Sequence, residues 1–249
     1  MKFLALDTDI LLYKAASSAE TEINYGDDVW SLYTDLKDAK QAFQFQVDRI
    51  TEKLNIKDYV CCLSDHKSNF RKDVDNTYKS NRKGTRKPVG YVALCDWVEA
   101  NFETFRKPSL EADDCLGILA TMPQNQGDKC IMVSDDKDLL TVPGKLYRPT
   151  KDEFVTTSEA EADKHFLMQV CTGDVTDGYK GIPGIGPKKA EALLGSRPHW
   201  GAVEQAFIKA GLTKDDAIQQ ARLARILRYS DWDEEKGQVK LWLPHSVSH

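Results

Sequence analysis

Acidic side chains gather at three points between residues 111 and 177 of the sequence. The clusters span residues 111–114, 135–138 and 174–177. Two carboxylates about 4 Å apart repel each other by roughly 1 kcal/mol in water and by about 4 kcal/mol near a protein surface. Clusters that converge in the fold would need divalent cations, whereas a single cluster in a first helical turn simply complements the helix dipole. Their recurrence favours metal binding.

A basic segment precedes the first acidic cluster. Residues 67–87 contain eight Lys or Arg side chains and only two acids, Asp73 and Asp75, in a chain whose net charge is −5. Two bound divalent cations would bring that charge to about −1. The negative charge of the protein would then no longer oppose the binding of a phosphate backbone to the basic segment. A solvated, flexible loop can have the same composition. Nucleic-acid binding and a plain loop both stay open at this point.

A glycine-rich turn follows the third acidic cluster, with the sequence GIPGIGPKKA at residues 181–190. Pro187 occupies the position where a nucleotide-binding P-loop needs its lysine, and Lys189 occupies the third glycine position of a dinucleotide-binding loop. No nucleotide cofactor is therefore expected. A tight turn that opens a helix can still bind one phosphate through its free N–H groups, with help from Lys188 and Lys189. A plain glycine turn is the alternative.

The composition limits the classes of protein to consider. The chain has 249 residues, 41% hydrophobic and 29% charged, enough for one large domain or one domain with an appendage. Its apolar runs are too short to cross a membrane, and Asp7 comes too early for a signal peptide. The six cysteines form no CxxC pair and lie mostly in apolar runs, which argues against zinc. A cytoplasmic protein is expected.

Apolar periodicity predicts that strands and helices alternate along the chain. The expected strands cover residues 2–6, 59–63, 129–133 and 239–243. The expected helices cover residues 10–17, 36–54, 89–105, 110–120, 158–171, 200–212 and 213–229. This order is typical of an α/β fold built on a doubly wound, mainly parallel sheet.

Such a sheet would bring distant acids together. Asp7, Asp65 and Asp136 each lie just past the carboxyl end of an expected strand. These ends share one edge of a parallel sheet, where ligands of open α/β folds bind. Asp174 and Asp177 are three residues apart, so they would lie on one face of a helical turn. We expect the acids to meet at one edge.

Five motifs together resemble those of the structure-specific 5′-nuclease superfamily. They are YKSNR at residues 78–82, LEADD at 110–114, DKD at 136–138, GDVTD at 173–177 and GIPGIGPKKA at 181–190. The resemblance extends over residues 7–243 and is best to the stand-alone 5′ to 3′ exonucleases of tailed bacteriophages. It implies a PIN-like, flap-endonuclease-type core at residues 1–172 and a helix-hairpin-helix DNA-binding region at 173–249. The core would include a basic arch segment at 66–108, which is short for this superfamily.

The resemblance also implies two metal clusters made of hard oxygen ligands, which suit two Mg²⁺ ions with Mn²⁺ as a substitute. A K⁺ ion is expected at the helix-hairpin-helix. The first cluster would consist of Asp7, Asp65, Glu111 and Asp113, and the second of Asp114, Asp136, Asp138, Asp174 and Asp177. Asp9 and Asp135 are interpreted as supporting or cap residues.

The implied reaction is two-metal hydrolysis of DNA from its 5′ end in phage replication, which leaves a 5′-phosphate and a 3′-hydroxyl. The catalytic residues would be Asp7, Asp136, Lys79 and Arg82, the last two balancing charge on the scissile phosphate. Double-stranded DNA, flapped DNA and RNA–DNA hybrids are the expected substrates. The expected DNA contacts are Arg71, Lys72, Lys79, Arg82, Lys83, Arg86 and Lys87 in the basic segment, and Gly181, Gly184, Gly186, Lys188 and Lys189 in the glycine-rich turn.

Two other interpretations compete with a nuclease. Residues 3–9 resemble the signature of haloacid-dehalogenase-type phosphatases, in which Asp7 would be the nucleophile. The GDVTD motif should then follow a strand, whereas the residues before it are expected to be helical. The other alternative is a non-catalytic DNA-binding protein with structural metals, which would not need so many carboxylates.

Overall fold

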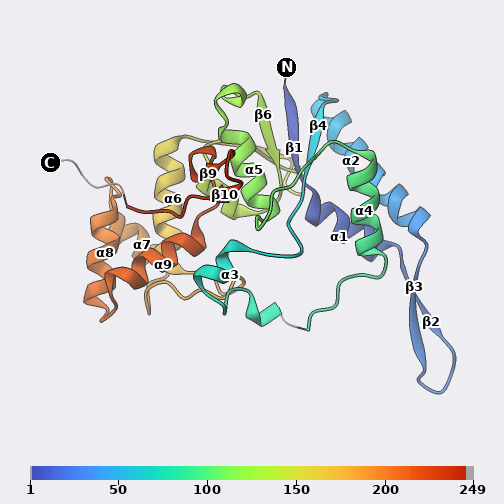
Figure 1. Cartoon of the computed structure of the whole chain (residues 1–249), viewed down its shortest axis with the longest axis horizontal. Coiled ribbons are helices and arrows are strands. Elements are labelled where there is room, and N and C mark those ends of the chain that lie inside the picture. Colours follow the sequence, from blue (N-terminus) through green and yellow to red (C-terminus); the bar gives the residue numbers. More distant parts are fainter. Residues whose placement is uncertain (1, 83, 245–249) are drawn as a thin grey trace.

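A six-stranded sheet forms the centre of the computed structural model, which describes residues 2–82 and 84–244 (Figure 1). The strand order is β5-β4-β1-β6-β7-β8. Neighbouring strands are parallel except for the antiparallel pair β7 and β8. The strands are β1 (Phe3–Asp7), β4 (Tyr59–Cys62), β5 (Thr104–Phe105), β6 (Cys130–Val133), β7 (Gly144–Arg148) and β8 (Glu153–Thr157). The prediction of an α/β fold with a mainly parallel sheet is confirmed.

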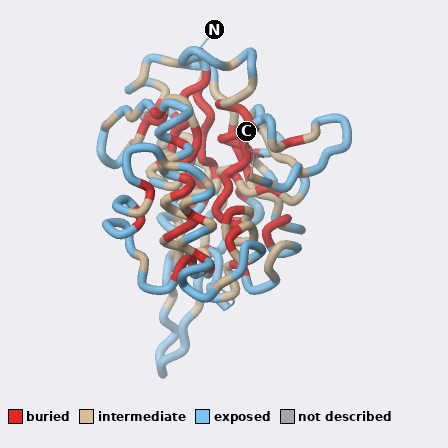
Figure 2. Tube along the Cα trace, turned by 90° about the vertical axis from the view of Figure 1, so that its left-hand side faces the viewer, coloured by how far each residue is buried: buried red, intermediate tan, exposed pale blue. Residues whose placement is uncertain are grey.

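Helices cover both faces of this sheet, and the buried residues follow the strands between them (Figure 2). Strand β1 shows how the residues divide: Leu4 and Leu6 pack into one hydrophobic core, whereas Ala5 packs into the other. The first core also contains residues of three helices, α1, α2 and α4, and the second contains residues of α5. These helices are α1 (Thr8–Ser18), α2 (Leu36–Leu54), α4 (Tyr91–Asn101) and α5 (Ala112–Thr121).

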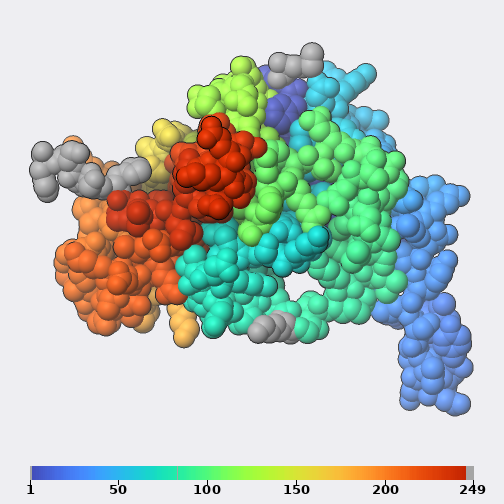
Figure 3. Space-filling view, viewed as in Figure 1, coloured from blue at the N-terminus to red at the C-terminus, as the bar shows by residue number. Residues whose placement is uncertain are grey.

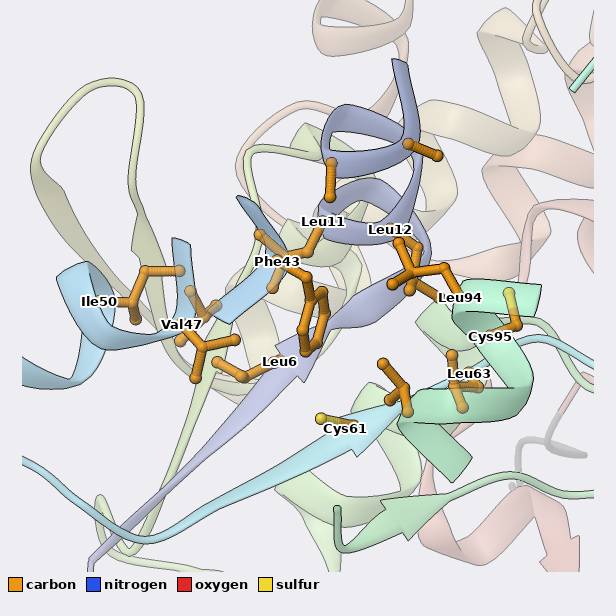
Figure 4. Close-up of a cluster of buried hydrophobic side chains, with 14 of the residues drawn as sticks. Leu6, Leu11, Leu12, Phe43, Val47, Ile50, Cys61, Leu63, Leu94 and Cys95 are labelled. Carbon is orange, nitrogen blue, oxygen red and sulfur yellow. The ribbon is translucent and has the colours of Figure 1, made fainter. Parts of the chain in front are cut away.

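Helix α2 occupies the residues that its periodicity predicts. The Asp35 side chain accepts a 2.8 Å hydrogen bond from the Lys37 N–H at its start, and Asn55 ends it in a left-handed conformation with φ of 51°. Phe43 and Val47, one turn apart, are fully buried beside β1 (Figure 4). The helix thus closes one face of the sheet.

A projecting hairpin is missing from the expected elements. It consists of β2 (Glu20–Asn24) and β3 (Trp30–Thr34) and extends away from the sheet (Figure 1). Residues 20–35 contain five acids and no Lys or Arg. The signal that predicts such a hairpin was present: the turn residues Gly26 and Asp27 lie between two runs rich in β-branched and aromatic side chains.

Other boundaries differ from the prediction for packing reasons. Helix α4 ends at Asn101, not at residue 105, because Phe102 turns to extended backbone and packs edge-on against Phe43 and Trp97. Strands β7 and β8 were not expected. The terminal strand is only β10 (Gln238–Val239), which pairs with β9 (Trp232–Asp233).

The C-terminal helices share a third hydrophobic core. They are α6 (Glu159–Thr172), α7 (Pro187–Leu194), α8 (Trp200–Lys209) and α9 (Lys214–Ala224). After α9 the chain returns to the sheet, where Ile226, Leu227 and Trp232 pack with α5. The division of the chain at residue 172 stays a prediction.

The arch segment, residues 66–108, lies between β4 and α5 in the chain and includes α4 and β5. It also contains the short helix α3 (Phe70–Val74) and a 3₁₀ turn at Ser80–Arg82, and Figure 3 shows an opening between its α3 and α4 parts. All six cysteines are buried free thiols. No helix in the described part of the chain, residues 2–82 and 84–244, combines the length and hydrophobicity of a membrane span.

Candidate active site

The carboxyl ends of β1 and β6 place two of the predicted acids next to each other. Asp7 ends β1 and accepts a 2.7 Å hydrogen bond from the Ser134 hydroxyl, which follows β6. Burial raises the pKa of Asp7 to about 7 against the effect of this hydrogen bond, and the charges of Asp9 and Asp136 raise it further. The sheet therefore holds a carboxylate that is costly to ionise.

Helix α5 and the turn after β6 add further acids. Burial raises the pKa of Asp113 well above its ordinary value, and the nearby charges of Asp7 and Asp136 add to the effect. Burial also raises the pKa of Asp138 to about 6, together with repulsion from Asp136 and Asp174. Five acids at this edge form no ion pair with a Lys or Arg in residues 2–82 and 84–244: Asp7, Asp113, Asp136, Asp138 and Asp174. We call these five acids the unpaired cluster.

A second group of acids lies beside basic side chains of the arch segment. Glu111 accepts hydrogen bonds from Arg71 at 3.1 Å and Lys79 at 2.5 Å. Asp177 pairs with Arg82 at 2.8 Å and with Lys79 at 3.5 Å. Although burial favours the neutral acid, Arg71 and Lys79 outweigh it and lower the pKa of Glu111 to about 2. We call Glu111, Asp114 and Asp177 the paired cluster.

Arg71 does not fit the predicted role of a DNA contact. The residue is 2% exposed, and each of its five side-chain N–H groups already has an acceptor. The acceptors belong to Glu111, Asp114 and the backbone carbonyls of Leu223 and Arg225. Composition placed this arginine in the basic segment, but burial makes it part of the core.

Asp114 likewise does not fit the predicted role of a metal ligand. It is fully buried, and both of its oxygens accept hydrogen bonds from the Arg71 guanidinium. The backbone N–H groups of Glu111 and Leu227 complete its acceptor sites at 3.0 and 3.1 Å. Asp114 therefore acts as an anchor between α5 and the C-terminal segment.

Asp65 lies at the expected end of β4, but its oxygens are occupied within the arch segment. It accepts hydrogen bonds from the N–H groups of Lys67 at 2.9 Å and Ser109 at 2.8 Å, and from the Ser68 hydroxyl. Burial opposes ionisation, but these hydrogen bonds prevail and lower the pKa of Asp65 to about 2. The structure thus does not bring Asp65 into the unpaired cluster.

Two acids near the site bind loops instead. Asp9 accepts a long hydrogen bond from the Ser64 N–H at 3.4 Å, and Asp135 binds the N–H and hydroxyl of Thr150. These contacts agree with a supporting role for Asp9 and Asp135.

Asp174 and Asp177 occur in a turn, not in the predicted helical turn. Within this turn the Asp174 side chain accepts a hydrogen bond from the Asp177 N–H at 3.1 Å.

The donor chemistry of the unpaired cluster suits a hard divalent cation. Within the described residues no three His, Cys, Asp or Glu side chains lie close enough together to enclose an ion. The cluster offers only carboxylate oxygens, however, and the mutual repulsion of Asp7, Asp113 and Asp136 is what such a cation would relieve. These acids are therefore the residues that would hold a metal.

The basic residues of the arch segment differ in what they contact. Lys79 has a left-handed backbone with φ of 53° and lies between Glu111 and Asp177, next to the unpaired cluster. Arg86 binds both oxygens of Glu20 at the base of the β2–β3 hairpin, and the Lys87 ammonium lies 4.4 Å from the centre of the Tyr91 ring. Lys72 is exposed on α3. The predicted contact Lys83 lies outside the described residues.

The glycine-rich turn is a type II turn followed by α7. The Ile185 N–H bonds to the Ile182 carbonyl, and Gly184 has the φ of +73° that this turn requires. A Cβ on Gly186 would meet open space, so this glycine leaves a surface free for a ligand. Lys188 is exposed, whereas Lys189 donates a hydrogen bond to the Gly184 carbonyl at 2.9 Å.

Gly181 does not fit the predicted role of a DNA contact. It is buried, and a Cβ at this position would lie 2.3 Å from the backbone nitrogen of Gly173. Its φ of +59° also favours glycine. Gly181 is therefore needed for close packing of two backbone segments.

Two residues that contact the acids, Tyr78 and Ser134, have no predicted role. The Tyr78 hydroxyl lies 2.9 Å from a carboxylate oxygen of both Glu111 and Asp177, and its proton can bond to only one of them. Ser134 donates to Asp7. The signal for Ser134 was its position at the end of a strand beside an acid, and the signal for Tyr78 was its place in the YKSNR motif.

Comparisons with known proteins agree with this architecture. The structure of the phage T5 D15 protein crystallised with metal ions aligns with a TM-score of 0.67 over 91% of this chain and 90% of that chain. The two sequences are 14% identical, so this likeness shows the fold. A complex of the same T5 flap endonuclease with DNA and metal ions aligns with a TM-score of 0.63.

Sequence relatives cover nearly the whole chain. The exonuclease of Escherichia phage T7 is 31% identical over 97% of this chain and 93% of its own length. The exodeoxyribonuclease of Enterobacteria phage T3 is 30% identical over 98% and 93%. The family model for the 5′–3′ exonuclease, N-terminal resolvase-like domain, matches residues 2–169. This chain therefore belongs to the 5′–3′ exonuclease family.

Proposed function

We propose that the edge formed by β1, β6 and α5 hydrolyses phosphodiester bonds of DNA from a 5′ end, with divalent cations held by the unpaired cluster. The chain is a 5′ to 3′ exonuclease of the flap-endonuclease type by its family. The observation that carries the site proposal is the position of Asp113, half-buried close to Asp7 and Asp136, with Lys79 near it.

The cations are proposed to be Mg²⁺, with Mn²⁺ as a substitute, because every candidate ligand is a carboxylate oxygen. When bound, such ions lower the pKa of water and stabilise a leaving oxygen. The side chains of this chain have two proposed roles. Asp7 and Asp136 would be negatively charged ligands at the sheet edge. Lys79 and Arg82 lie where they can neutralise a phosphate that approaches the acids.

DNA binding is proposed for two exposed surfaces. Lys72 and Lys87 line the arch segment, and Gly186 and Lys188 lie at the start of α7, whose free N–H groups and dipole favour a phosphate. Duplex or flapped DNA would span both surfaces. We also propose that a K⁺ ion binds at the glycine-rich turn. RNA–DNA hybrids are a further proposed substrate. The T5 flap endonuclease was solved in complex with DNA, which supports it.

The phosphatase alternative has no support from these findings. Its late acidic motif would have to follow a strand, whereas residues 173–177 follow helix α6. A non-catalytic DNA-binding protein is not supported either, since the relatives over the full chain are named as exonucleases.

End-labelled DNA tests the proposal directly. Duplex, flapped and RNA–DNA hybrid substrates are incubated with and without Mg²⁺, and the polarity and chemistry of the product ends are read. We expect Mg²⁺-dependent release from the 5′ end with 5′-phosphate products. Cleavage in a chelator at the rate seen with Mg²⁺, or release from the 3′ end, would contradict the proposal.

The basic residues are tested by their response to salt. Lys79→Ala should lower the single-turnover rate at saturating DNA by about 10² to 10³ and leave the salt dependence of binding unchanged. Lys188→Ala should instead weaken binding and flatten the slope of log affinity against log salt by about 0.7 to 0.9. A Lys79→Ala variant that binds weakly but cleaves at the normal saturated rate would show that Lys79 only tethers DNA.

A further inference from the structure

Arg71 joins three parts of the chain that are far apart in sequence. It lies on α3 of the arch segment, and its Nη1 and Nη2 atoms donate to Asp114 on α5 at 2.7 and 2.8 Å. Its Nε and Nη2 atoms also donate to the carbonyls of Leu223 and Arg225, at 3.0 and 2.6 Å, at the end of α9. Only a planar guanidinium supplies five donors in this arrangement. The contact fixes the arch segment to both helix α5 and the end of helix α9.

The same guanidinium reaches the proposed catalytic lysine through one carboxylate. Glu111 Oε2 accepts from Arg71 Nη1 at 3.1 Å and from the Tyr78 hydroxyl at 2.9 Å, while Glu111 Oε1 accepts from Lys79. Arg71 therefore holds one oxygen of Glu111 in every arrangement of the Tyr78 proton, which that tyrosine shares between Glu111 and Asp177. The other oxygen of Glu111 is directed at Lys79. The orientation of the Lys79 ammonium depends on the orientation of this carboxylate.

We propose that Arg71 is a positioning residue, which orients Lys79 for phosphate through Glu111 and couples this orientation to the C-terminal helices. This inference rests on the proposed catalytic role of Lys79. Arg71 itself touches no substrate, because it is buried and all its donors are used. A lysine at this position would keep the charge but lose the fork geometry.

A double-mutant cycle tests the coupling. Single-turnover rates at saturating DNA are measured for the wild type, Arg71→Lys, Lys79→Ala and the double variant, each corrected for the fraction of active molecules. Arg71→Lys should lower the rate about tenfold in the wild type, because a misplaced catalytic group costs rate, but less than about twofold in the Lys79→Ala background. Asp73→Asn, an exposed substitution on the same helix, serves as the control and should change neither rate.

A spectroscopic measurement separates positioning from a merely structural role. In metal-free protein, the NMR signal of the Lys79 Cε carbon, identified by its loss in Lys79→Ala, should shift in Arg71→Lys and not in Asp73→Asn. If Arg71→Lys does not fold, Tyr78→Phe takes its place in both measurements, because it removes the hydroxyl that contacts the same Glu111 oxygen and Asp177.

The outcomes are distinguishable. Equal losses in both backgrounds, or an unchanged Lys79 signal, would overturn the coupling while leaving Lys79 as a catalytic residue. A normal rate for Arg71→Lys with a slow Lys79→Ala would do the same. A normal rate for Lys79→Ala would overturn the proposed function of that lysine, and with it this inference.

Discussion

The unpaired and paired clusters lie at the same edge of the sheet, yet the folded protein shifts the pKa values of their acids in opposite directions. Acids of the unpaired cluster repel one another, and burial raises the pKa of Asp7 to about 7. In the paired cluster, Arg71 and Lys79 lower the pKa of Glu111 to about 2 despite its burial. The charges of the paired cluster are thus balanced within the folded chain, whereas we propose that those of the unpaired cluster are balanced by a cation. Carboxylates that look alike in the sequence therefore have different roles.

The largest expected effect is the loss of cleavage when the unpaired cluster is broken. Asp136→Asn and Asp113→Asn should each lower the single-turnover rate by at least about 10³-fold, because the cation site loses a charged ligand. Binding of duplex DNA should stay the same or become tighter, since a negative charge that repels phosphate is gone. Rates within tenfold of wild type in both variants would remove the metal assignment.

The paired cluster should respond through stability instead. Asp114→Asn takes from the buried Arg71 its bidentate carboxylate partner and leaves only Glu111 to balance its charge, which should lower the free energy of unfolding by about 3 to 5 kcal/mol. Asp113→Asn, one residue away on the same helix, should not destabilise the metal-free protein, because it removes repulsion. Urea unfolding of both variants measures the difference. Equal destabilisation would show that the two clusters are not distinct in the way described.

The pH dependence of stability tests the unpaired cluster without any substrate. The pKa of Asp7 is raised in the folded chain, so its contribution to stability is full below about pH 4 and is lost as the pH rises to about 7. The loss amounts to about 4 kcal/mol at most. In a chelator, the unfolding free energy of Asp7→Asn should therefore fall less between pH 4 and 7 than that of the wild type. Added Mg²⁺ should restore the wild-type protein, and identical pH profiles would contradict the prediction.

The smallest effect is expected far from both clusters. Gly186→Val should weaken duplex binding about three- to tenfold, because a side chain there would obstruct the approach of a phosphate to the start of α7. Cleavage of a short single-stranded substrate should change less. Gly186 is a better site for this test than Gly184, whose φ of +73° makes any other residue strained. Equal losses on both substrates would argue against a separate duplex-binding surface.

The sequence predicted the sheet and the acidic edge because both depend on local patterns. Apolar runs marked β1, β4 and β6, and the acids after β1 and β6 met where parallel strand ends must meet. Asp65, after β4, did not join them, because its oxygens are bound by Lys67, Ser68 and Ser109. The roles of Arg71 and Asp114 could not be predicted in this way. Both lie in motifs rich in charge, and only the return of the chain at Leu223–Leu227 buries them and supplies their partners. Contacts of such long sequence separation leave no trace in composition or spacing.

The hairpin β2–β3 was missed for a different reason. Its turn residues and β-branched runs were present in the sequence, but none of its residues belongs to the three hydrophobic cores, so burial adds no apolar pattern to that signal. Glu20 connects the hairpin to the arch segment through the Arg86 guanidinium and the Val89 N–H, which are again distant in sequence. Elements that pack on the sheet are therefore easier to read from the sequence than elements that project from it.

The burial of all six cysteines has a practical consequence for single-molecule work. Burial raises the pKa of the Cys61 and Cys171 thiols to about 11 and that of Cys130 to about 12, so at pH 7 only about one such thiol in 10⁴ is the reactive thiolate. A cysteine introduced by Tyr25→Cys, at a site 67% exposed in the hairpin turn, would then react with a maleimide dye almost alone. The native sequence can be labelled at one chosen point without first removing its own cysteines.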